Sequence, residues 1–447
     1  MSSAIQIPAG LAALIEPYAS CAEPVTLHAT TTIAGRFAID MVDNEWDVGG
    51  REMANYPSFD FYDADVRAAG KVIAGNMPWS EDTAPQIRDA FAVANSWRDS
   101  HAYPMRSIRY TALWYIRKLG IEGISAARLK RMQAIRRKLR RLPSLRLNQL
   151  QDLGGCRVIL PTIADVDALV SAVRSGMRHD LRGQDDYISS PKSDGYRSHH
   201  LKLSFRGRQA TKIYDGRRVE LQVRTRLQHS WATAVEAVGL FRGEDLKAHV
   251  GSEDWLRLFL LLSGELAEAE GRLAPPNVPD RPLRIAEIRE LQGKLDAINL
   301  LESVSHGVRG TDFNLAPGYK PTHYLIRFEH STKRVYVEPH TIPTWATRSY
   351  DSAEALDNQT GFDTQNIVLV EVDKIENLKA AYPNYFGDVE MLKQQLKWIA
   401  RGTGAVEFVP GKEPQPSREI RQQPADPRWL TRNRFLKSNS RASGEQD

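Results

Sequence analysis

The sequence predicts a mixed α/β fold, in which helices flank a sheet and a smaller α/β unit follows near the C-terminus. One observation is the alternation of apolar and polar residues in GRRVELQVRT (216–225), which is typical of a strand with one buried face. A second is the helical periodicity of the segments between such strands. A third is the return of strand patterns after residue 317, beyond a Pro-rich joint. Strands and helices that alternate in this way favour an α/β architecture.

The basic segment RLKRMQAIRRKLRRL (128–142) is predicted to form an amphipathic helix. Met132, Ile135, Leu139 and Leu142 make one stripe, and cations occupy the opposite side. The other elements follow from the same periodicities. They are helices at 62–75, 84–104 and 106–120, a strand at 156–161, a helix at 165–176, a polar loop around 183, strands at 198–205 and 216–225, helices at 226–241, 254–271 and 283–303, and strands at 323–328, 333–339 and 366–372.

Shifts in composition divide the chain into five parts. Their boundaries fall where the apolar pattern weakens or where proline accumulates, as in LAPPNVPDRP. The parts are an N-terminal extension of unknown role (1–57), the main α/β core (58–272), a Pro-rich joint with a connecting helix (273–316), a small C-terminal α/β unit (317–402) and a polar tail expected to be disordered (403–447).

Composition excludes several classes of protein. Of the 447 residues, 42% are hydrophobic and 26% charged, and no apolar run approaches the length of a membrane span. Cys21 and Cys156 are the only cysteines, too few for a disulfide scaffold or a zinc knuckle. The N-terminus has no basic start before its short apolar run, so no signal peptide is expected. We therefore expect a cytoplasmic protein without a membrane partner.

Positive charge is concentrated in one window of the sequence. Residues 96–150 contain fourteen Lys or Arg against two acids, Asp99 and Glu122, which gives that window +12 and the rest of the chain −7 of the total +5. Such segregation favours a polyanionic partner, either nucleotide phosphates or RNA. An ordinary solvated basic face is the alternative, and charge alone does not decide between them.

The stretch DDYISSPKSDGYRSHHLKLSF (185–205) combines side chains that a simple hairpin does not need. Leu201, Leu203 and Phe205 mark the buried face of a strand, which leaves His200 on the polar face and Tyr196 and Lys192 in the loop before it. An aromatic ring beside cations is suited to stack a base and to hold phosphate. We therefore interpret Lys192, Tyr196 and His200 as a nucleotide-binding group.

Two acidic residues lie at positions suited to a metal ion. Alternation in VELQVRT buries Val219, Leu221 and Val223, so Glu220, Gln222 and Arg224 share the other face. Asp152 lies just before the strand predicted at 156–161. Carboxylates at strand ends often hold a cation that bridges phosphates. Asp152 and Glu220 are 68 residues apart in the sequence, so only the fold can bring them together.

Five blocks taken together resemble the alarmone synthetase domain of RelA/SpoT proteins, and the resemblance extends over roughly residues 60–260. Members of that family transfer pyrophosphate from ATP to a ribose 3′-hydroxyl, most often that of GDP or GTP. The resemblance implies that the main α/β core (58–272) is a pyrophosphokinase domain with a mixed, nucleotidyltransferase-like sheet. The blocks, in the order typical of the family, are RLKRMQAIRRKL, QDLGGCR, DDYISSPKSDGYRSHH, VELQVRT and QHSWATAVE.

The resemblance also implies roles for individual residues. Asp152 and Glu220 are expected to hold Mg²⁺ on the ATP phosphates, and Glu220 is expected to help deprotonate the attacking hydroxyl. The other implied site residues are Arg128, Lys130, Lys138 and Arg157 for ATP, with Arg128 and Arg157 on either side of the adenine; Lys192, Tyr196 and His200 for the acceptor, with Tyr196 stacked on its base; and Gln222 and Arg224 at the cleft floor.

The sequence departs from the family at three positions near these residues. Ala134 replaces the usual serine of the basic helix, His199 replaces a leucine, and Asp194 replaces the loop asparagine. None of these changes removes an expected metal ligand. We recognise no hydrolase domain of the kind that accompanies long alarmone enzymes.

The segment NLKAAYPNYFGDVEMLKQQLKWI (377–399) places Tyr382 and Tyr385 on a turn between two helices, because Pro383 disfavours helical geometry at the residue before it. Two tyrosines in such a turn most often clamp the helices together. A synthetase core followed by a small cysteine-free unit with this motif also resembles the CapRel family of fused toxin–antitoxin proteins. That resemblance implies a pseudo-zinc-finger-like unit whose tyrosines block the ATP site until a phage protein releases them.

Three functions remain open from the sequence. The favoured one is an autoinhibited pyrophosphokinase that modifies the 3′ CCA end of tRNA, stops translation and serves antiphage defence. The second is a (p)ppGpp or (p)ppApp synthetase that uses a free nucleotide in the stringent response. The third is a catalytically inactive RNA-binding regulator, which the joint presence of Asp152, Lys192, Tyr196 and Glu220 disfavours. No DNA partner is expected.

Overall fold

The computed structural model describes the synthetase-like core, the helices that follow it and most of the C-terminal strands. Nearly all of the predicted N-terminal extension, most of the predicted tail and Tyr385 lie outside the described residues. The described residues are 56–75, 80–307, 309–310, 321–329, 332, 334–359, 365–372, 378, 382, 389–406 and 408.

Nine described strands form one sheet, in the order β3-β4-β5-β2-β1-β9-β7-β8-β6. The pairs β2/β5 and β6/β8 are parallel, and the other neighbours are antiparallel. The mixed α/β fold predicted from the sequence is therefore confirmed. The strands are β1 (Ile124–Leu129), β2 (Gly154–Leu160), β3 (Asp180–Asp186), β4 (His199–Ser204), β5 (Arg218–Thr225), β6 (Arg309–Gly310), β7 (His323–Glu329), β8 (Arg334–His340) and β9 (Gln365–Glu371).

Strand register produces a polar face on the first half of the sheet. Glu220 of β5 lies opposite Gly155 of β2 on one side and Lys202 of β4 on the other. One pair further along, Gln222 lies opposite both Arg157 and His200. Directly opposed residues share a face, so these side chains project together. The reverse face carries apolar residues and is buried.

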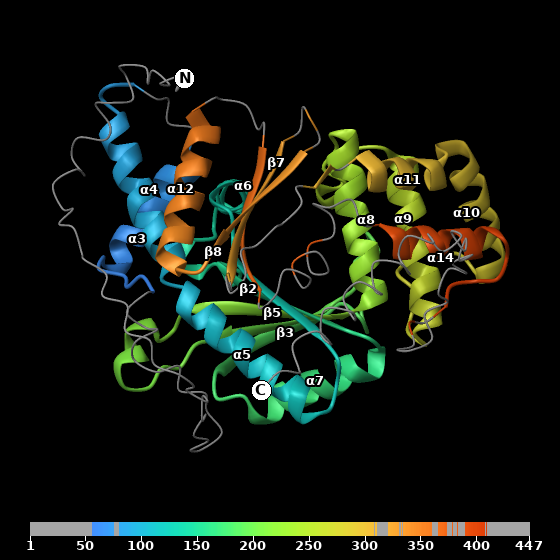
Figure 1. The fold of residues 1–447 in the computed structure, drawn as a ribbon, viewed down its shortest axis with the longest axis horizontal. Helices are drawn as coiled ribbons and strands as arrows, with labels where there is room; N and C mark the ends of the chain where they lie inside the picture. The colour runs from blue at the N-terminus through green and yellow to red at the C-terminus, as the bar shows by residue number, and fades with distance from the viewer. Residues whose placement is uncertain are drawn as a thin grey trace, which may run out of the picture. The chain divides into compact units, whose positions relative to one another are not determined.

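Helices α5 (Ala102–Lys118) and α7 (Ile163–Gly176) cover that apolar face (Figure 1). Thr162 begins α7 with a capping box, since its hydroxyl accepts from the Asp165 amide while the Asp165 carboxylate accepts from the Thr162 amide. Helices α3 (Asp63–Ala74), α4 (Ala84–Asp99) and the basic helix α6 (Met132–Arg141) form a separate apolar cluster. The basic helix is thus held by its own apolar stripe, which leaves its cations outside.

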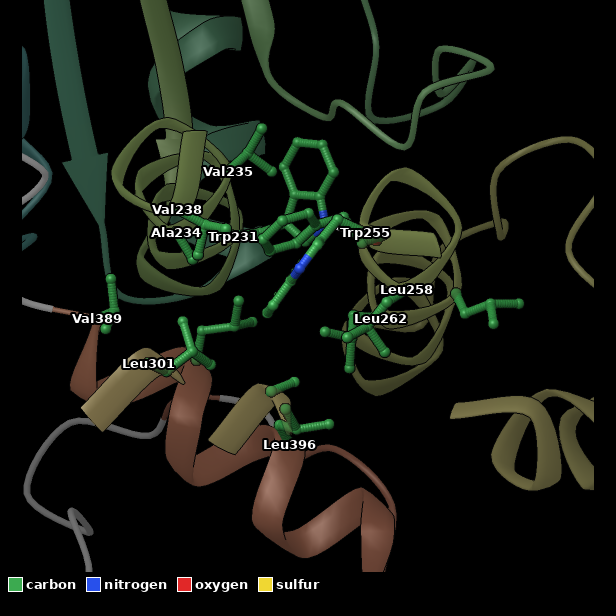
Figure 2. Close-up of a cluster of buried hydrophobic side chains, with 14 of the residues drawn as sticks. Trp231, Ala234, Val235, Val238, Trp255, Leu258, Leu262, Leu301, Val389 and Leu396 are labelled. Atoms are coloured by element: carbon green, nitrogen blue, oxygen red, sulfur yellow. Dashed lines mark hydrogen bonds between the residues drawn. The ribbon is translucent and has the colours of Figure 1, made fainter. Parts of the chain in front are cut away.

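A second group of helices packs beside the polar face. It contains α8 (Arg226–Arg242), α9 (Glu253–Ala269), α10 (Arg281–Leu295), α11 (Ala297–Gly307) and α14 (Glu390–Ala400). Figure 2 shows how α8 contributes Trp231 and Val238, α9 contributes Trp255 and Leu262, and α14 contributes Leu396 to one buried cluster. The last described helix therefore shares a core with helices of the synthetase-like region.

The C-terminal strands continue the sheet of the core through the pairing of β9 with β1. Glu371 of β9 is buried, and its carboxylate lies 3.5 Å from Arg106 and 3.4 Å from Arg109 of α5. Helix α12 (Pro343–Gln359) is tied to the core by Arg98, which is 1% exposed and pairs with Asp351 at 2.7 Å. At both places an ion pair with a buried arginine joins the C-terminal unit to the core.

Two predicted elements differ in the structure. The predicted helix at 128–142 begins only at Met132, because Arg128 and Leu129 belong to β1, where they pair with β2. Leu142 is exposed and does not continue the apolar stripe. The polar loop expected near residue 183 is strand β3, which pairs with β4 through a register shift at Gly183. In both cases pairing with a distant strand outweighs the local pattern.

Two further corrections concern the C-terminal half. The helix predicted at 283–303 is two helices, because Asp296 adopts a left-handed conformation (φ +47°) between α10 and α11. The first residues of the predicted disordered tail are ordered: the Gln395 side chain bonds both the amide and the carbonyl of Val406. The strands predicted at 323–328, 333–339 and 366–372 are confirmed as β7, β8 and β9. Over the described residues, no helix combines the length and apolar character needed to cross a membrane.

Candidate active site

A cleft of about 1080 Å³ lies over the polar face of the sheet, between the basic helix α6 and helix α8. All eleven residues that the sequence assigned to ATP, acceptor, metal or cleft floor line it, and so does Tyr382. The eleven are Arg128, Lys130, Lys138, Asp152, Arg157, Lys192, Tyr196, His200, Glu220, Gln222 and Arg224.

The cleft carries a strong excess of positive charge. Among its described lining residues are twelve Lys or Arg and six carboxylates. Arg137, Arg140 and Arg141 of the basic helix are exposed at its rim. Cations concentrated in a cleft raise the local concentration of an anionic ligand. The arrangement is suited to a polyphosphate, optionally with a longer polyanion across the rim.

Asp152 lies between two lysines. Lys130 donates to one carboxylate oxygen at 2.6 Å and Lys138 to the other at 3.0 Å. Burial raises the pKa of Asp152, but the two ammonium groups outweigh burial and hold this pKa below its usual value. Asp152 is therefore ionised at neutral pH. Each oxygen still has a second lone pair for another ligand.

Glu220 is held at both oxygens. One oxygen lies 3.0 Å from Nδ1 of His200, and the other accepts from the Gln222 amide at 2.7 Å. Burial raises the pKa of Glu220, while His200 and Gln222 lower it more strongly, so the pKa lies below its usual value. A carboxylate that stays ionised and fixed in this way is suited to hold a cation.

The two carboxylates lie near enough for the charge of Asp152 to raise the pKa of Glu220 in part. Gly155 lies opposite Glu220, and an added Cβ there would touch only the Arg128 carbonyl oxygen, at 3.6 Å. The sheet surface beside Glu220 is therefore open. Two ionised carboxylates beside an open part of the sheet surface are a donor set that suits Mg²⁺, which keeps waters and phosphate oxygens as its other ligands.

The loop that carries Lys192 and Tyr196 is anchored by helix α9. Gly195 has φ +91°, and a Cβ there would lie 3.0 Å from the Ser263 side chain, so only glycine fits. Ser263 donates to the Gly195 carbonyl at 2.6 Å. Next to it, the buried Arg197 donates to Glu270 at 2.6 Å. These contacts fix the loop before any ligand arrives.

Tyr196 and His200 are bonded to each other, with the phenol oxygen 2.9 Å from Nε2. Burial lowers the pKa of His200, but Tyr196 and Glu220 raise it, to about 9. Burial raises the pKa of Tyr196, but His200 and Arg224 lower it, to about 8. The ammonium of Lys192 lies 4.3 Å from the ring centre of Tyr187 and 5.2 Å from that of Tyr196.

Tyr382 lies between the two arginines that the sequence assigned to adenine. Its ring centre is 5.7 Å from the Arg128 guanidinium and 5.1 Å from that of Arg157. The residue is 2% exposed and belongs to an apolar cluster with Val370 and Val372. Its amide donates to the Leu378 carbonyl at 3.0 Å. Tyr385, its predicted companion, lies outside the described residues.

Residues of helix α8 complete the far wall. Glu236 lines the cleft and accepts from Lys247 at 2.7 Å. Burial raises the pKa of Glu236, but Lys247 and Arg157 hold it well below its usual value. His229 lies seven residues before Glu236 on the same helix but does not line the cleft; it is buried, with Nδ1 2.5 Å from the Arg224 guanidinium.

No pattern in the sequence indicated a site role for Asp185, Tyr187 or Lys202, yet all three line the cleft. Lys202 bonds Asp185 at 2.8 Å. The parity of Lys202 with His200 on β4 was the signal that indicated its direction. Tyr187 gave no such signal, because it follows a strand that the sequence did not predict.

Comparison with known proteins gives a family match over the cleft-forming part of the chain. Residues 127–242 match the family model described as "Region found in RelA / SpoT proteins". The chain is 28% identical over 157 residues to the GTP pyrophosphokinase of Escherichia coli K12 and 29% identical over 111 residues to GTP pyrophosphokinase YjbM of Bacillus subtilis 168. These alignments cover 33% and 24% of this chain, but only 20% and 51% of the two proteins.

Solved structures are similar to part of the chain. Small alarmone synthetase 1 from Bacillus subtilis, bound to its product pppGpp, is 24% identical with a TM-score of 0.31, and the match covers 39% of this chain and 95% of that one. A GTP pyrophosphokinase family protein from Streptococcus pneumoniae is 20% identical with a TM-score of 0.32, and the match covers 42% and 94%. Residues 127–242 of this chain therefore carry the match to RelA/SpoT proteins, and the alignments to the two pyrophosphokinases agree with it.

Proposed function

We propose that the protein is an ATP-dependent pyrophosphokinase that transfers pyrophosphate to a ribose 3′-hydroxyl. The observation that carries this proposal is the single cleft in which two ionised carboxylates from separate segments, Asp152 and Glu220, lie among cations and beside Tyr196. Transfer of this kind depends mainly on positioning and on neutralisation of charge, which such a set supplies. The RelA/SpoT family of residues 127–242 supports the same activity.

The donor side of the cleft consists of Arg128, Lys130, Lys138 and Arg157, which would bind ATP. Asp152 and Glu220 would hold Mg²⁺, which bridges phosphate oxygens and neutralises their charge when bound. The two lysines that bond Asp152 would hold the phosphates next to it. The two arginines, now beside the Tyr382 ring, would lie beside the adenine.

The acceptor side consists of Lys192, Tyr196 and His200. Tyr196 would stack on the acceptor base, and Lys192 would meet its phosphate. Stacking contributes about 1–3 kcal/mol and discriminates little between bases. The favoured acceptor is the 3′ CCA end of tRNA, because the exposed arginines of α6 that line the cleft add positive charge beyond the residues assigned to ATP. The second candidate is GDP or GTP, favoured by the relatives named GTP pyrophosphokinase.

We infer further that the C-terminal unit restrains the enzyme, as in a fused toxin–antitoxin of antiphage defence. The buried Tyr382 ring takes the place between Arg128 and Arg157 that adenine would need. ATP binding therefore requires this tyrosine to leave, and a phage protein that displaces the C-terminal unit would permit it. Released enzyme would modify tRNA and stop translation.

The test uses ATP labelled at its γ-phosphate with the full chain and its Tyr382→Ala variant, offered either GDP or tRNA. We expect Tyr382→Ala to label tRNA, and periodate oxidation of the tRNA 3′ end to abolish labelling. Label confined to GDP would reject the tRNA acceptor in favour of a nucleotide. Label in neither, with Asp152→Asn indistinguishable from its parent, would reject the pyrophosphokinase.

The restraint has a separate test in growing cells. Expression of Tyr382→Ala should arrest growth without any phage, and the added Asp152→Asn substitution should restore it. Inhibition through Tyr382 would be rejected by two results together: the cells grow normally, and the purified Tyr382→Ala protein is no more active than the wild type.

A further inference from the structure

We propose that His200 is a positioning residue that holds the Glu220 carboxylate and the Tyr196 ring in one fixed arrangement, so that the cation ligand and the stacking ring on the acceptor side are set by a single imidazole. This inference rests on the proposed function, and goes beyond it by giving His200 a role in the carboxylate's geometry. It begins from the bonded series Tyr196–His200–Glu220–Gln222, with separations of 2.9, 3.0 and 2.7 Å.

The protonation pattern of the series follows from its ends. An ionised carboxylate can only accept hydrogen bonds, so Nδ1 of His200 must carry the proton that faces Glu220. Nε2 then bonds the Tyr196 hydroxyl, which can donate or accept. An imidazole has two nitrogens on opposite sides of one rigid ring, and therefore spans the two partners.

The imidazole itself is held firmly. His200 is 7% exposed and lies opposite Gln222 in the β4/β5 register. Two tyrosine rings pack nearly edge-on against it, Tyr187 with centroids 5.3 Å apart at 86° and Tyr196 with centroids 5.7 Å apart at 83°. Such packing prevents the ring from turning, so its two bonds have fixed directions.

Consequences for Glu220 follow from the number of its lone pairs. His200 and Gln222 each use one lone pair on a different oxygen, which leaves both oxygens able to contact a cation. Mutation of a residue that hydrogen-bonds to a metal-binding carboxylate typically lowers metal affinity or activity by about 10–100-fold. Removal of His200 would free one oxygen and let the carboxylate rotate.

The chain offers a matched control in the preceding residue. His199 is equally exposed, at 7%, and lies on the same strand, but it is not among the cleft-lining residues; its ring nitrogens lie 3.4 Å from Gln184 and 3.5 Å from Asp186. Replacement of either histidine by asparagine makes the same change in volume and polarity. A general effect of altering β4 would appear in both variants, whereas the proposed role belongs to His200 alone.

The experiment compares His200→Asn with His199→Asn in the full chain carrying Tyr382→Ala. We expect His200→Asn to lower kcat about 10–100-fold and to raise KM for the acceptor. We also expect it to weaken binding of Mn²⁺ alone, followed by electron paramagnetic resonance, by about tenfold or more. His199→Asn should change none of these values by more than about twofold.

A double-mutant cycle separates positioning from simple packing. Tyr196→Phe keeps the ring and removes the hydroxyl, so its effect on the acceptor KM should be largely absent when His200→Asn is already present. Additive effects in that cycle, or equal kinetics and Mn²⁺ affinity in the two asparagine variants, would overturn the proposal. If His200→Asn fails to fold by thermal melting, His200→Gln replaces it in the same comparisons.

Failure of the proposed function would look different. A Tyr382→Ala chain that transfers pyrophosphate to no acceptor rejects the pyrophosphokinase, while the Mn²⁺ measurement still decides whether His200 orients Glu220. Conversely, a chain that transfers normally after His200→Asn retains its function and loses only the positioning role.

Discussion

The two sides of the cleft differ in where their side chains come from. On the donor side, cations of β1, β2 and α6 contact Asp152 or Tyr382, which lie in other segments of the chain. On the acceptor side, all the side chains come from β4, β5 and the loop before β4. Lys130 and Lys138 bond Asp152, and Arg128 and Arg157 flank Tyr382 from the C-terminal unit. The acceptor side is assembled through Tyr196, His200 and Glu220. The restraint that we propose for the C-terminal unit therefore concerns ATP, whereas the acceptor side is already assembled without it.

The largest expected effect comes from the residue that the two sides share. Glu220→Gln should lower transfer about 10²–10³-fold, because a neutral amide supplies no charge for the cation and cannot hold it equally well. Steady-state transfer in the Tyr382→Ala chain measures the loss. Asp180→Asn, at an exposed pair with Arg206 outside the cleft, is the control and should retain full activity. Normal turnover of the Glu220→Gln variant would show that Glu220 has no role in transfer on either side of the cleft.

Tyr382→Ala is expected to have the next largest effect, restricted to the donor side. Loss of two ring–guanidinium contacts, each of roughly 0.5–1 kcal/mol, should tighten ATP binding about tenfold. Calorimetry with a non-hydrolysable ATP analogue measures the change. Tyr382→Phe keeps the ring and should bind like wild type. Equal tightening of acceptor binding would break the comparison, since it would mean that the C-terminal unit covers both sides.

A smaller effect is expected where α12 joins the core. Asp351→Asn weakens the pair with the buried Arg98 and should lower the free energy of unfolding by about 1–2 kcal/mol, measured by urea titration. ATP affinity should rise slightly in the same variant, because the C-terminal unit is held less firmly. Asp63→Asn breaks an exposed pair with Arg67 and should cost less than about 0.5 kcal/mol. Equal losses in the two variants would mean that the Arg98 pair does not anchor α12.

Lys192→Ala should have the smallest effect, on the acceptor side only. The exposed ammonium faces two tyrosine rings, and its loss should weaken acceptor binding about fivefold, or about 1 kcal/mol, without changing ATP affinity. Equilibrium binding of each substrate separately measures both values. A change in ATP affinity of similar size would show that Lys192 serves both sides.

Local pattern was sufficient for the residues on β5. Alternation in VELQVRT indicated which side chains face the cleft, and the structure places Glu220, Gln222 and Arg224 there. The same reasoning was insufficient for Arg128, which lies in a helix-like pattern but belongs to β1. Strand pairing with β2 decides its conformation, and no neighbour in the sequence records that pairing.

The cleft also contains residues that only packing could reveal. Tyr187 lines it because β3 pairs with β4, and β3 carries a polar sequence with no strand pattern. His229 shows the opposite case: its seven-residue spacing from Glu236 puts both residues on one side of α8, yet His229 contacts Arg224 in the interior and does not line the cleft. Spacing along a helix gives a direction, but the neighbouring elements determine whether that direction is a cleft or a core.

The sequence by itself determined three of the five core strands, β2, β4 and β5, together with the parity of their side chains and the chemical types gathered for phosphate, base and cation. It did so because side-chain direction repeats every two residues along any extended strand. Only the tertiary structure decided that Asp152 and Glu220 share one cleft, that β9 extends the sheet at β1 and that Tyr382 lies between Arg128 and Arg157. These relations join segments many residues apart, and their stability comes from burial and ion pairs between elements, which local sequence does not encode.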